Sequence, residues 1–290
     1  ARRHRLRVVP LASVVPRPDA AALMRVSDEF DRPRAVILCS SADAPDIVRR
    51  AMDRARRAKA LLPPAQGRHI LDPLAEGRWR GLSYAVLPHC AELATWRFAW
   101  RVQRELLAPL LFDWLWQVNA ATLRDVPDNE QDRFAQPLKV LGSVEALSDR
   151  VRSDALHAAD RLQAGTWRPK TVLMHGDLWK GNLLLRPPTG ALDSLQWRER
   201  FIVIDWPGSQ SRGHAIYDLV RLAQSMRLGD TRLRAEVQRH CDLLGCRRED
   251  AISHLLAALG HMAMHLEHFP MQMFTTMAEA CHATLARAID

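Results

Sequence analysis

The sequence is poor in cysteine and has no long apolar run. Its five cysteines are an odd number without any CxxC pair, which argues against a disulfide scaffold and favours a reducing compartment. No eighteen consecutive apolar residues occur, so a membrane span is not expected. The basic start is followed by an apolar stretch that is too short and too interrupted for a signal peptide, Leu6-Arg7-Val8-Val9-Pro10. We therefore expect a cytoplasmic protein with no membrane partner.

Lysine is also scarce, since only four of the 41 basic residues are lysines. The formal net charge of +8 would permit binding to nucleic acid. The arginines, however, are scattered singly among apolar residues, and no RNP-like, zinc-finger or basic-zipper pattern accompanies them. We interpret the charge as a solvated surface with an arginine bias. No nucleic-acid partner is expected, and the sequence leaves the oligomeric state open.

The length of 290 residues suits two lobes. In the first 88 residues we expect a strand at 34–39, a helix that Asp43 or Asp46 caps and Pro63-Pro64 ends, and a strand at 84–87. From residue 89 the pattern is helical. Pro109 is expected to interrupt or kink the first helix, and a later helix is expected over about 143–162. Tryptophans at helical spacing are assigned to packing: Trp96, Trp100, Trp114 and Trp116.

Two short motifs carry residues suited to phosphoryl transfer. The first runs from His175 to Asn182 as HGDLWKGN, and the second is IVIDW at 202–206. An aspartate at a loop entrance can orient a substrate hydroxyl and accept its proton, which suits Asp177. Carboxylate and amide oxygens are ligands for Mg²⁺, which suits Asp205 and Asn182. The loop or hairpin tip expected after Leu185 would bring those two residues together across adjacent antiparallel strands.

These motifs, followed by Tyr217-Asp218-Leu219, resemble the aminoglycoside phosphotransferase and choline kinase superfamily, whose relatives include fructosamine kinases. The resemblance implies an α+β, bilobal protein-kinase-like fold, with a small mixed β-rich N-lobe at 1–88 and a larger helical C-lobe at 89–290. It implies an enzyme that moves the γ-phosphate of ATP, with Mg²⁺, to a hydroxyl of a small molecule. The acceptor stays open among aminoglycosides, sugars and amino alcohols.

The resemblance also assigns roles to single residues. Asp177 is then the catalytic base, Asn182 and Asp205 bind magnesium, and Asp218 braces the catalytic loop. His175 is expected to hold the loop through hydrogen bonds to the backbone or to Asp218, because kinase-like phosphoryl transfer does not use it as the base. Lys180 lies three residues after Asp177, where it either contacts the transferred phosphate or a substrate anion, or is a solvent-exposed loop lysine.

The first 88 residues depart from the kinase pattern. Kinase-like folds anchor the ATP phosphates with a lysine on the third strand, a glutamate on the next helix and a glycine-containing loop. The strand at 35–39 has no lysine, and no glycine precedes Gly67. Arg34 is the candidate for the phosphate anchor, and Asp53 is the candidate for the helix acid. A chain without this clamp could instead be a catalytically silent, kinase-like binding module.

Four histidines recur near the end of the chain: His254, His261, His265 and His268. Their spacing puts them near one face of a helix if 251–269 is helical. Histidines four residues apart can chelate zinc, but no HExxH or cysteine pattern accompanies them, and Glu267 points about a hundred degrees from His268. A polar or substrate-facing stripe is favoured over a metal site.

Overall fold

The structure, a computed structural model, describes residues 6–11, 21–188, 197–266 and 269–289. Contacts divide the chain into two units. Unit 1 comprises Ala1–Leu107 and Gly181–Gly208, and unit 2 comprises Ala108–Lys180 and Ser209–Asp290. Each unit is therefore made of two separate segments of the chain, whereas the predicted lobes divide the chain once, at residue 88. The predicted lobe boundary stays a prediction.

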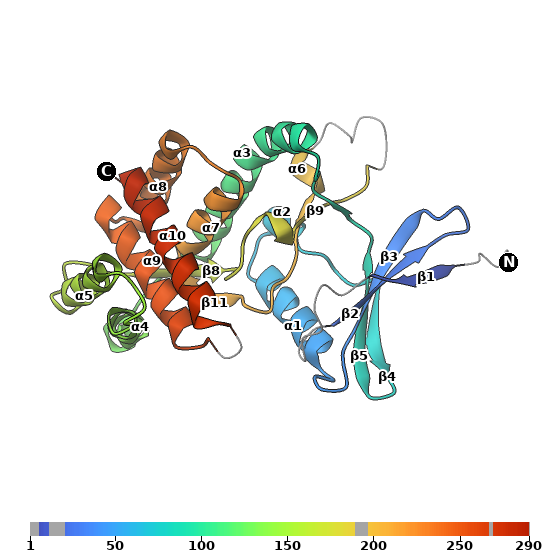
Figure 1. Ribbon diagram of the computed structural model, residues 1–290, viewed down its shortest axis with the longest axis horizontal. Coiled ribbons are helices and arrows are strands. Elements are labelled where there is room, and N and C mark those ends of the chain that lie inside the picture. Colours follow the sequence, from blue (N-terminus) through green and yellow to red (C-terminus); the bar gives the residue numbers. More distant parts are fainter. Residues whose placement is uncertain (1–5, 12–20, 189–196, 267–268, 290) are drawn as a thin grey trace. The chain divides into compact units, whose positions relative to one another are not determined.

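Unit 1 is built on an antiparallel sheet with the strand order β1-β2-β3-β5-β4, coloured blue to cyan in Figure 1. Its strands are β1 (Arg7–Pro10), β2 (Ala22–Ser27), β3 (Pro33–Cys39), β4 (Ala75–Trp79) and β5 (Leu82–Pro88). The predicted strands at 34–39 and 84–87 correspond to β3 and β5. β3 occupies the middle of the sheet, where its aliphatic and β-branched residues have neighbouring strands on both sides.

Helix α1 (Ile47–Ala60) packs on β5 and ends before Pro63-Pro64, where the short helix α2 (Pro64–Gly67) begins. Asp46 is the N-cap residue, but its side chain makes no capping hydrogen bond. The backbone N–H groups of Val48 and Arg49 donate instead to the hydroxyls of Ser40 and Ser83, at 3.2 Å each. The predicted cap position is right and the predicted capping group is wrong, because two serines from neighbouring strand ends satisfy these free donors.

A smaller sheet completes unit 1. Its strands are β6 (Ala91–Glu92), β9 (Leu183–Leu185) and β10 (Phe201–Val203), in the order β10-β9-β6. The four-residue helix α6 (Trp197–Arg200) precedes β10, and helix α3 (Arg97–Thr122) follows β6. β9 begins directly after the first sequence motif, and β10 contains the first two residues of the second.

Helix α3 differs from the sequence prediction in two respects. It continues through Pro109 as one helix, so the helix is not interrupted there, and the alternative of a kink at Pro109 stays a prediction. Trp96, just before the helix, is 70% exposed, so its assignment to packing is wrong, whereas Trp114 is 5% exposed and does pack in the core.

Unit 2 combines a small sheet with most of the helices. The sheet has the order β11-β8-β7 and consists of β7 (Arg124–Asp125), β8 (Lys170–Met174) and β11 (Gln210–His214). A 3-10 turn, η1, covers Asp128–Glu130. The helices are α4 (Asp132–Gly142), α5 (Asp149–Gln163), α7 (Tyr217–Ser225), α8 (Asp230–Leu244), α9 (Arg248–Ala263) and α10 (Met271–Ile289). The helix predicted over 143–162 therefore begins later, at Asp149, after the cap residue Ser148.

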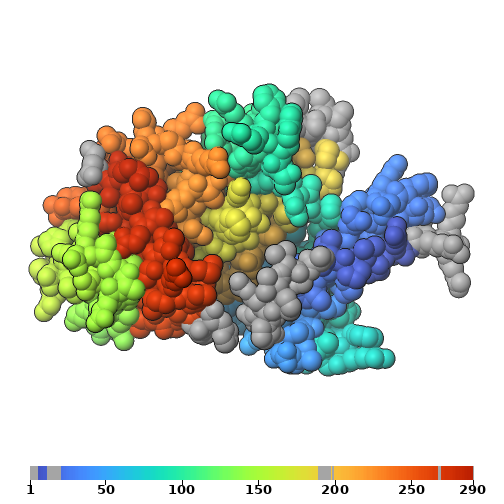
Figure 2. All heavy atoms as spheres, in the orientation of Figure 1, coloured from blue at the N-terminus to red at the C-terminus, as the bar shows by residue number. Residues whose placement is uncertain are grey.

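Helix α9 is the centre of unit 2. It is buried on nearly every side and packs against α4, α5, α8 and α10, which surround it in Figure 1. Gly260 makes the contact with α4 so close that a Cβ there would lie 2.0 Å from the carbonyl oxygen of Pro137. Figure 2 shows the surface of the same unit, where α5 in yellow-green lies beside α10 in red. There Ser148 donates from its N–H and its hydroxyl to Glu279.

The α+β class predicted from the sequence is confirmed, with helices concentrated in unit 2 and the larger sheet in unit 1. None of the described helices is long and apolar enough to cross a membrane.

Candidate active site

The loop after β8 is held by a buried carboxylate. Val172, Leu173 and Met174 of β8 are buried, and the chain then turns at Gly176, whose φ of 86° lies in the left-handed region that glycine adopts readily. Asp218, in the first turn of α7, accepts the N–H of His175 at 2.5 Å and the N–H of Gly176 at 3.1 Å. The backbone just before Asp177 is therefore tied to α7 by both carboxylate oxygens of Asp218.

The environment of Asp218 is nearly dry, since the residue is only 3% exposed. Burial raises the pKa of this carboxyl to about 7, although the N–H groups of His175 and Gly176 act in the opposite direction and the nearby Asp177 charge adds to the increase. A buried carboxylate that accepts two N–H groups positions a loop well, and it is too enclosed to meet a substrate.

His175 is also buried, at 2% exposed. Its ring Nδ1 accepts the backbone N–H of Asp177 at 3.2 Å. The proton of a neutral ring is therefore assigned to Nε2, since Nδ1 acts as the acceptor. With its own backbone N–H bound to Asp218, His175 links the bracing residue to the backbone of Asp177.

Asp177 itself reaches solvent. Its side chain is 49% exposed, and Oδ1 lies 3.6 Å from Nη2 of Arg221 on α7. Sequence reasoning missed Arg221. The signal was present, because Arg221 follows Asp218 by three residues and so lies on the same helix face as the bracing carboxylate. α7 thus contacts the loop after β8 at two points, through the backbone of residues 175–176 and through the Asp177 side chain.

Lys180 follows at the start of a 3-10 turn, η2 (Lys180–Asn182). Lys180 is exposed. Its backbone N–H donates, at 3.1 Å, to the hydroxyl of Ser225 at the end of α7. The C-terminal side of the loop is therefore also tied to α7, and the direct phosphate contact stays a prediction.

Asn182 and Asp205 lie near each other in unit 1 because β9 and β10 pair antiparallel. Leu183 is opposite Val203, and the N–H of Ile204 donates to the carbonyl of Asn182 at 3.0 Å. Asp205 is the next residue after Ile204, so the two predicted metal ligands lie diagonally across one hairpin.

Asp205 has an unusual backbone. Its φ of 66° places a residue other than glycine in the left-handed region, which costs on the order of 1 kcal/mol. The next residue supports this turn, because Trp206 is 3% exposed and its ring N–H donates to the carbonyl of Val203 at 3.0 Å. Asp205 itself is exposed. Asp31, another exposed aspartate, has a similar φ of 58°, and aspartate is one of the few residues besides glycine that adopt this region.

These ligands fit Mg²⁺ by their chemistry. Mg²⁺ takes one or two carboxylates together with water and phosphate oxygens, and Asp205 supplies an exposed carboxylate on the same hairpin as the Asn182 amide. Within the described ranges, no group of three or more His, Cys, Asp or Glu is gathered to hold a metal ion. The histidine stripe therefore offers no zinc site within those ranges, and His268 and Glu267 lie outside them.

The predicted phosphate anchor in unit 1 already has a partner. Both Nε and Nη2 of Arg34 bind Oδ2 of Asp28, at 3.0 and 2.7 Å, in the turn between β2 and β3. Asp53 pairs with Arg56 at 2.6 Å on α1. The described contacts do not join Arg34 to Asp53. Arg25, in the middle of β2, is a further basic residue of this sheet. Its Nη2 lies 3.9 Å from Asp31, and its buried Nε has no hydrogen-bond partner among the residues that the structure describes.

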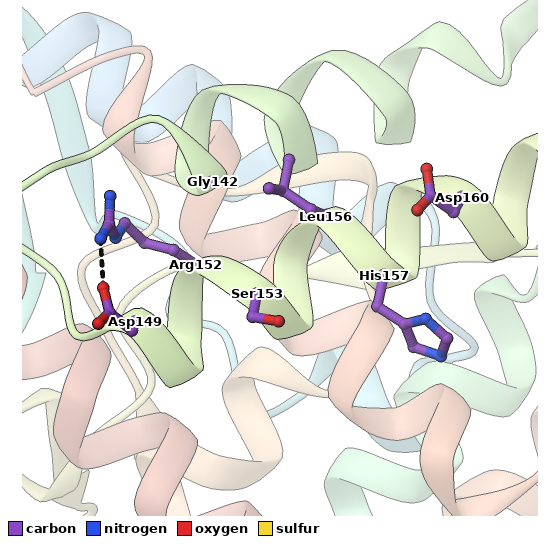
Figure 3. A pocket seen from close by; sticks show the side chains of 7 residues that line it. All are labelled: Gly142, Asp149, Arg152, Ser153, Leu156, His157 and Asp160. Carbon is purple, nitrogen blue, oxygen red and sulfur yellow. Dashed lines mark hydrogen bonds and ion pairs between the residues drawn. The ribbon is translucent and has the colours of Figure 1, made fainter.

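A cavity of about 460 Å³ along α5 holds none of the predicted site residues (Figure 3). Ser153, His157 and Asp160 line it at helical spacing, but Figure 3 shows their side chains pointing apart. Arg152 and Asp149 pair with each other at its rim. We assign no catalytic role to this surface.

Comparison with known proteins places the fold. No sequence model of a protein family matches the chain, and no curated protein matches it by sequence. Among solved structures, a thermostable mutant of an aminoglycoside phosphotransferase in ternary complex with AMP-PNP and hygromycin B has a TM-score of 0.51 at 16% identity, covering 97% of this chain and 94% of that one. Choline kinase from Streptococcus pneumoniae has a TM-score of 0.52 at 13% identity, with 97% and 93% covered.

A choline/ethanolamine kinase family protein from Mesorhizobium loti gives a TM-score of 0.51 at 14% identity, with 98% and 92% covered. The similarity therefore extends over nearly the full length of each chain. It confirms the predicted kinase-like fold.

Proposed function

We propose that the protein is a small-molecule kinase that transfers the γ-phosphate of ATP to a hydroxyl group, with Mg²⁺ as the metal. The observation that carries this proposal is the hydrogen bonding of Asp218 to the backbone of His175 and Gly176. A buried carboxylate that fixes the loop before a half-exposed aspartate is the arrangement that positioning of a catalytic base requires.

Asp177 would act as the base in this reaction. Its exposed carboxylate can accept a hydrogen bond from the acceptor hydroxyl and take its proton as the hydroxyl oxygen bonds to the γ-phosphorus. The bond from the γ-phosphorus to the bridging oxygen breaks, and ADP leaves with the electron pair. Arg221 holds the carboxylate from one side at 3.6 Å, which limits the orientations that Asp177 can adopt.

Asn182 and Asp205 would hold the metal. Mg²⁺ bound to phosphate oxygens supplies charge neutralisation during phosphoryl transfer. The hairpin of β9 and β10 fixes the spacing of the two side chains through backbone pairing. The left-handed turn at Asp205 sets the direction of its carboxylate independently of the extended strand before it.

The activity test uses radiolabelled ATP and pooled small metabolites. The protein should produce labelled products that need Mg²⁺, and Asp177→Asn should lower the rate by about 10²- to 10⁴-fold, the contribution of a general base. Asp160→Asn is the matched control, since Asp160 is an exposed aspartate of the same unit outside the motif. Equal labelled product from Asp177→Asn and the unchanged protein would exclude Asp177 as the base.

A silent kinase-like binding module is the second candidate function. It is favoured by the absence of a lysine on β3 and by the engagement of Arg34 with Asp28. Melting temperature with millimolar ATP or GTP and Mg²⁺ separates the two, because a ligand that binds only the folded state raises it. A rise that Asp205→Ala abolishes, together with labelled product, supports the kinase. A rise without product supports the silent module, and no rise with either nucleotide counts against the kinase.

A further inference from the structure

Unit 2 contains a cavity of about 180 Å³ that the motifs did not indicate. It lies where α4, β11 and the end of α9 meet, three elements that Figure 1 shows close together. β11 contributes Gln210, Arg212 and His214, and its register is irregular between Gln210 and Gly213, so simple alternation does not hold along the strand. The last turn of α9 and the residues after it contribute His261 and His265.

The walls of the cavity are rich in groups that both donate and accept hydrogen bonds. The rings of His214 and His261 are 6.0 Å apart, and those of His261 and His265 are 4.6 Å apart. Burial lowers the pKa of His214 and of His261. Near neutral pH both rings are therefore uncharged, with one nitrogen that donates and one that accepts. Nδ1 of His214, on a residue only 5% exposed, has no hydrogen-bond partner within the described residues.

α4 adds a backbone acceptor. Pro137 lines the cavity inside this helix, and proline has no N–H to donate to the carbonyl four residues earlier. That carbonyl belongs to Arg133, which also lines the cavity. An unpaired ring nitrogen and a carbonyl without its helical donor are polar groups that a hydroxylated ligand can satisfy.

The charges around the cavity balance. Arg133 and Arg212 both bind Glu130, at 3.3 and 2.8 Å, and Asp132 lines the cavity as well. The lining therefore carries two guanidinium groups and one carboxylate, and the carboxylate of Glu130 pairs with both guanidinium groups. A polycationic ligand would require an acidic excess that these four groups do not supply.

The cavity lies beside β8, the strand that leads into the loop of Asp177. Gln210, which lines the cavity, is opposite Met174 in the antiparallel pair of β11 and β8. Met174 precedes Asp177 by three residues, and three residues span at most about 10 Å. A ligand that extends from the cavity along this strand end therefore approaches the predicted base.

The volume of the cavity limits the size of the ligand that it can enclose. Pockets for drug-sized molecules have volumes of roughly 300–1,000 Å³, whereas this cavity has about 180 Å³. A single sugar ring is of this order, and an aminoglycoside of several rings is larger.

We propose that this cavity binds the acceptor of the phosphotransfer reaction and that the acceptor is an uncharged, single-ring polyol of monosaccharide size. The inference rests on the proposed function and narrows its substrate class. It disfavours aminoglycosides by size and charge. It disfavours quaternary amino alcohols because Phe134, the aromatic residue that lines the cavity, is only 1% exposed and offers no open ring face to a cation.

Binding is measured first, by calorimetry without nucleotide on the full chain. The probes are glucose, mannose, galactose, N-acetylglucosamine and myo-inositol, with choline and kanamycin for comparison. At least one polyol should bind more tightly than choline and kanamycin. Failure of all five polyols to bind, or tighter binding of choline or kanamycin, overturns the proposal.

Variants locate the site. His265→Ala removes an exposed ring and should weaken polyol binding about three- to tenfold, the range for one lost hydrogen bond. Met264→Trp fills the cavity and should weaken it at least tenfold. His157→Ala removes an exposed histidine of α5 that does not line this cavity, and binding should stay within twofold. Unchanged binding in both cavity variants, with their melting temperatures preserved, overturns the location.

Kinetics with ATP then separates the two levels of the inference. In both cavity variants the KM for the polyol should rise by the same factors while the KM for ATP stays within twofold. Transfer to a polyol with an unchanged KM in both variants overturns the cavity and leaves the kinase function standing. Binding in the cavity without transfer to any polyol overturns the acceptor role, and labelled product from another acceptor would still support the kinase.

Discussion

Replacing Asp218 with asparagine should remove a specific part of the pH dependence of stability. Burial raises the pKa of this carboxyl from 3.8 to about 7. Between these values the folded chain holds a proton that the unfolded chain has lost. The contribution of Asp218 to the free energy of unfolding therefore falls as the pH rises. At about 1.36 kcal/mol for each tenfold difference in proton affinity, the fall between pH 5 and pH 8 is about 2.5 kcal/mol.

The assay is equilibrium unfolding in urea at pH 5, 6.5 and 8. Asp218→Asn loses one acceptor for the N–H groups of His175 and Gly176, which costs about 1–3 kcal/mol at every pH. The diagnostic quantity is therefore how the gap between the two proteins changes with pH. The gap should shift by about 2.5 kcal/mol in favour of Asp218→Asn from pH 5 to pH 8.

Asp160→Asn serves as the control for the Asp218 experiment, since Asp160 is exposed on α5. Its gap to the unchanged protein should stay constant within about 0.5 kcal/mol. A constant gap for Asp218→Asn as well would refute the reasoning. That result would mean that the two N–H donors offset burial and hold the pKa at or below its ordinary value, where it no longer changes stability between pH 5 and pH 8.

Three further predictions test other parts of unit 2. His254 is fully buried, and burial lowers its pKa to about 4, so its contribution to stability is complete above pH 6.5 and is lost as the pH falls towards 4. In urea unfolding, the free energy of unfolding of His254→Leu should therefore rise by about 2 kcal/mol relative to that of the unchanged protein between pH 7 and pH 5. The same pH dependence of stability in both proteins would contradict this. Gly260→Ala brings a Cβ to 2.0 Å from the Pro137 carbonyl oxygen and should lower the free energy of unfolding by about 3 kcal/mol. Gly229→Ala, whose added Cβ would meet nothing within 4 Å, should lower it by less than about 1 kcal/mol. Equal melting temperatures of the two variants would disprove the close packing of α4 and α9. Arg221→Met removes the partner of Asp177 and should lower kcat roughly tenfold to a hundredfold with the KM for ATP unchanged; a rise in the KM for ATP with normal kcat would argue that Arg221 serves the nucleotide instead.

Much of the local structure could be predicted because it depends on neighbours in the chain. β3 and β5 follow from their runs of aliphatic residues. The pairing that puts Asn182 opposite Ile204 follows from two apolar strands with a polar break between them. The sequence pattern predicts the start of α5 at about residue 143, whereas α4 ends at Gly142 and α5 begins at Asp149, after its N-cap residue Ser148. Such boundaries depend on capping contacts that a hydrophobic pattern does not contain.

By itself, the sequence determined which groups are available for chemistry: a carboxylate at 177, an amide at 182, carboxylates at 205 and 218, and the order in which they occur. Only the tertiary structure decided the contacts between distant segments, including the pairing of Arg221 with Asp177 and the cavity that α4, β11 and α9 share. The physical reason is that spacing along the chain specifies one face of one helix or strand. Burial, charge pairing and cavity volume depend on which elements pack together.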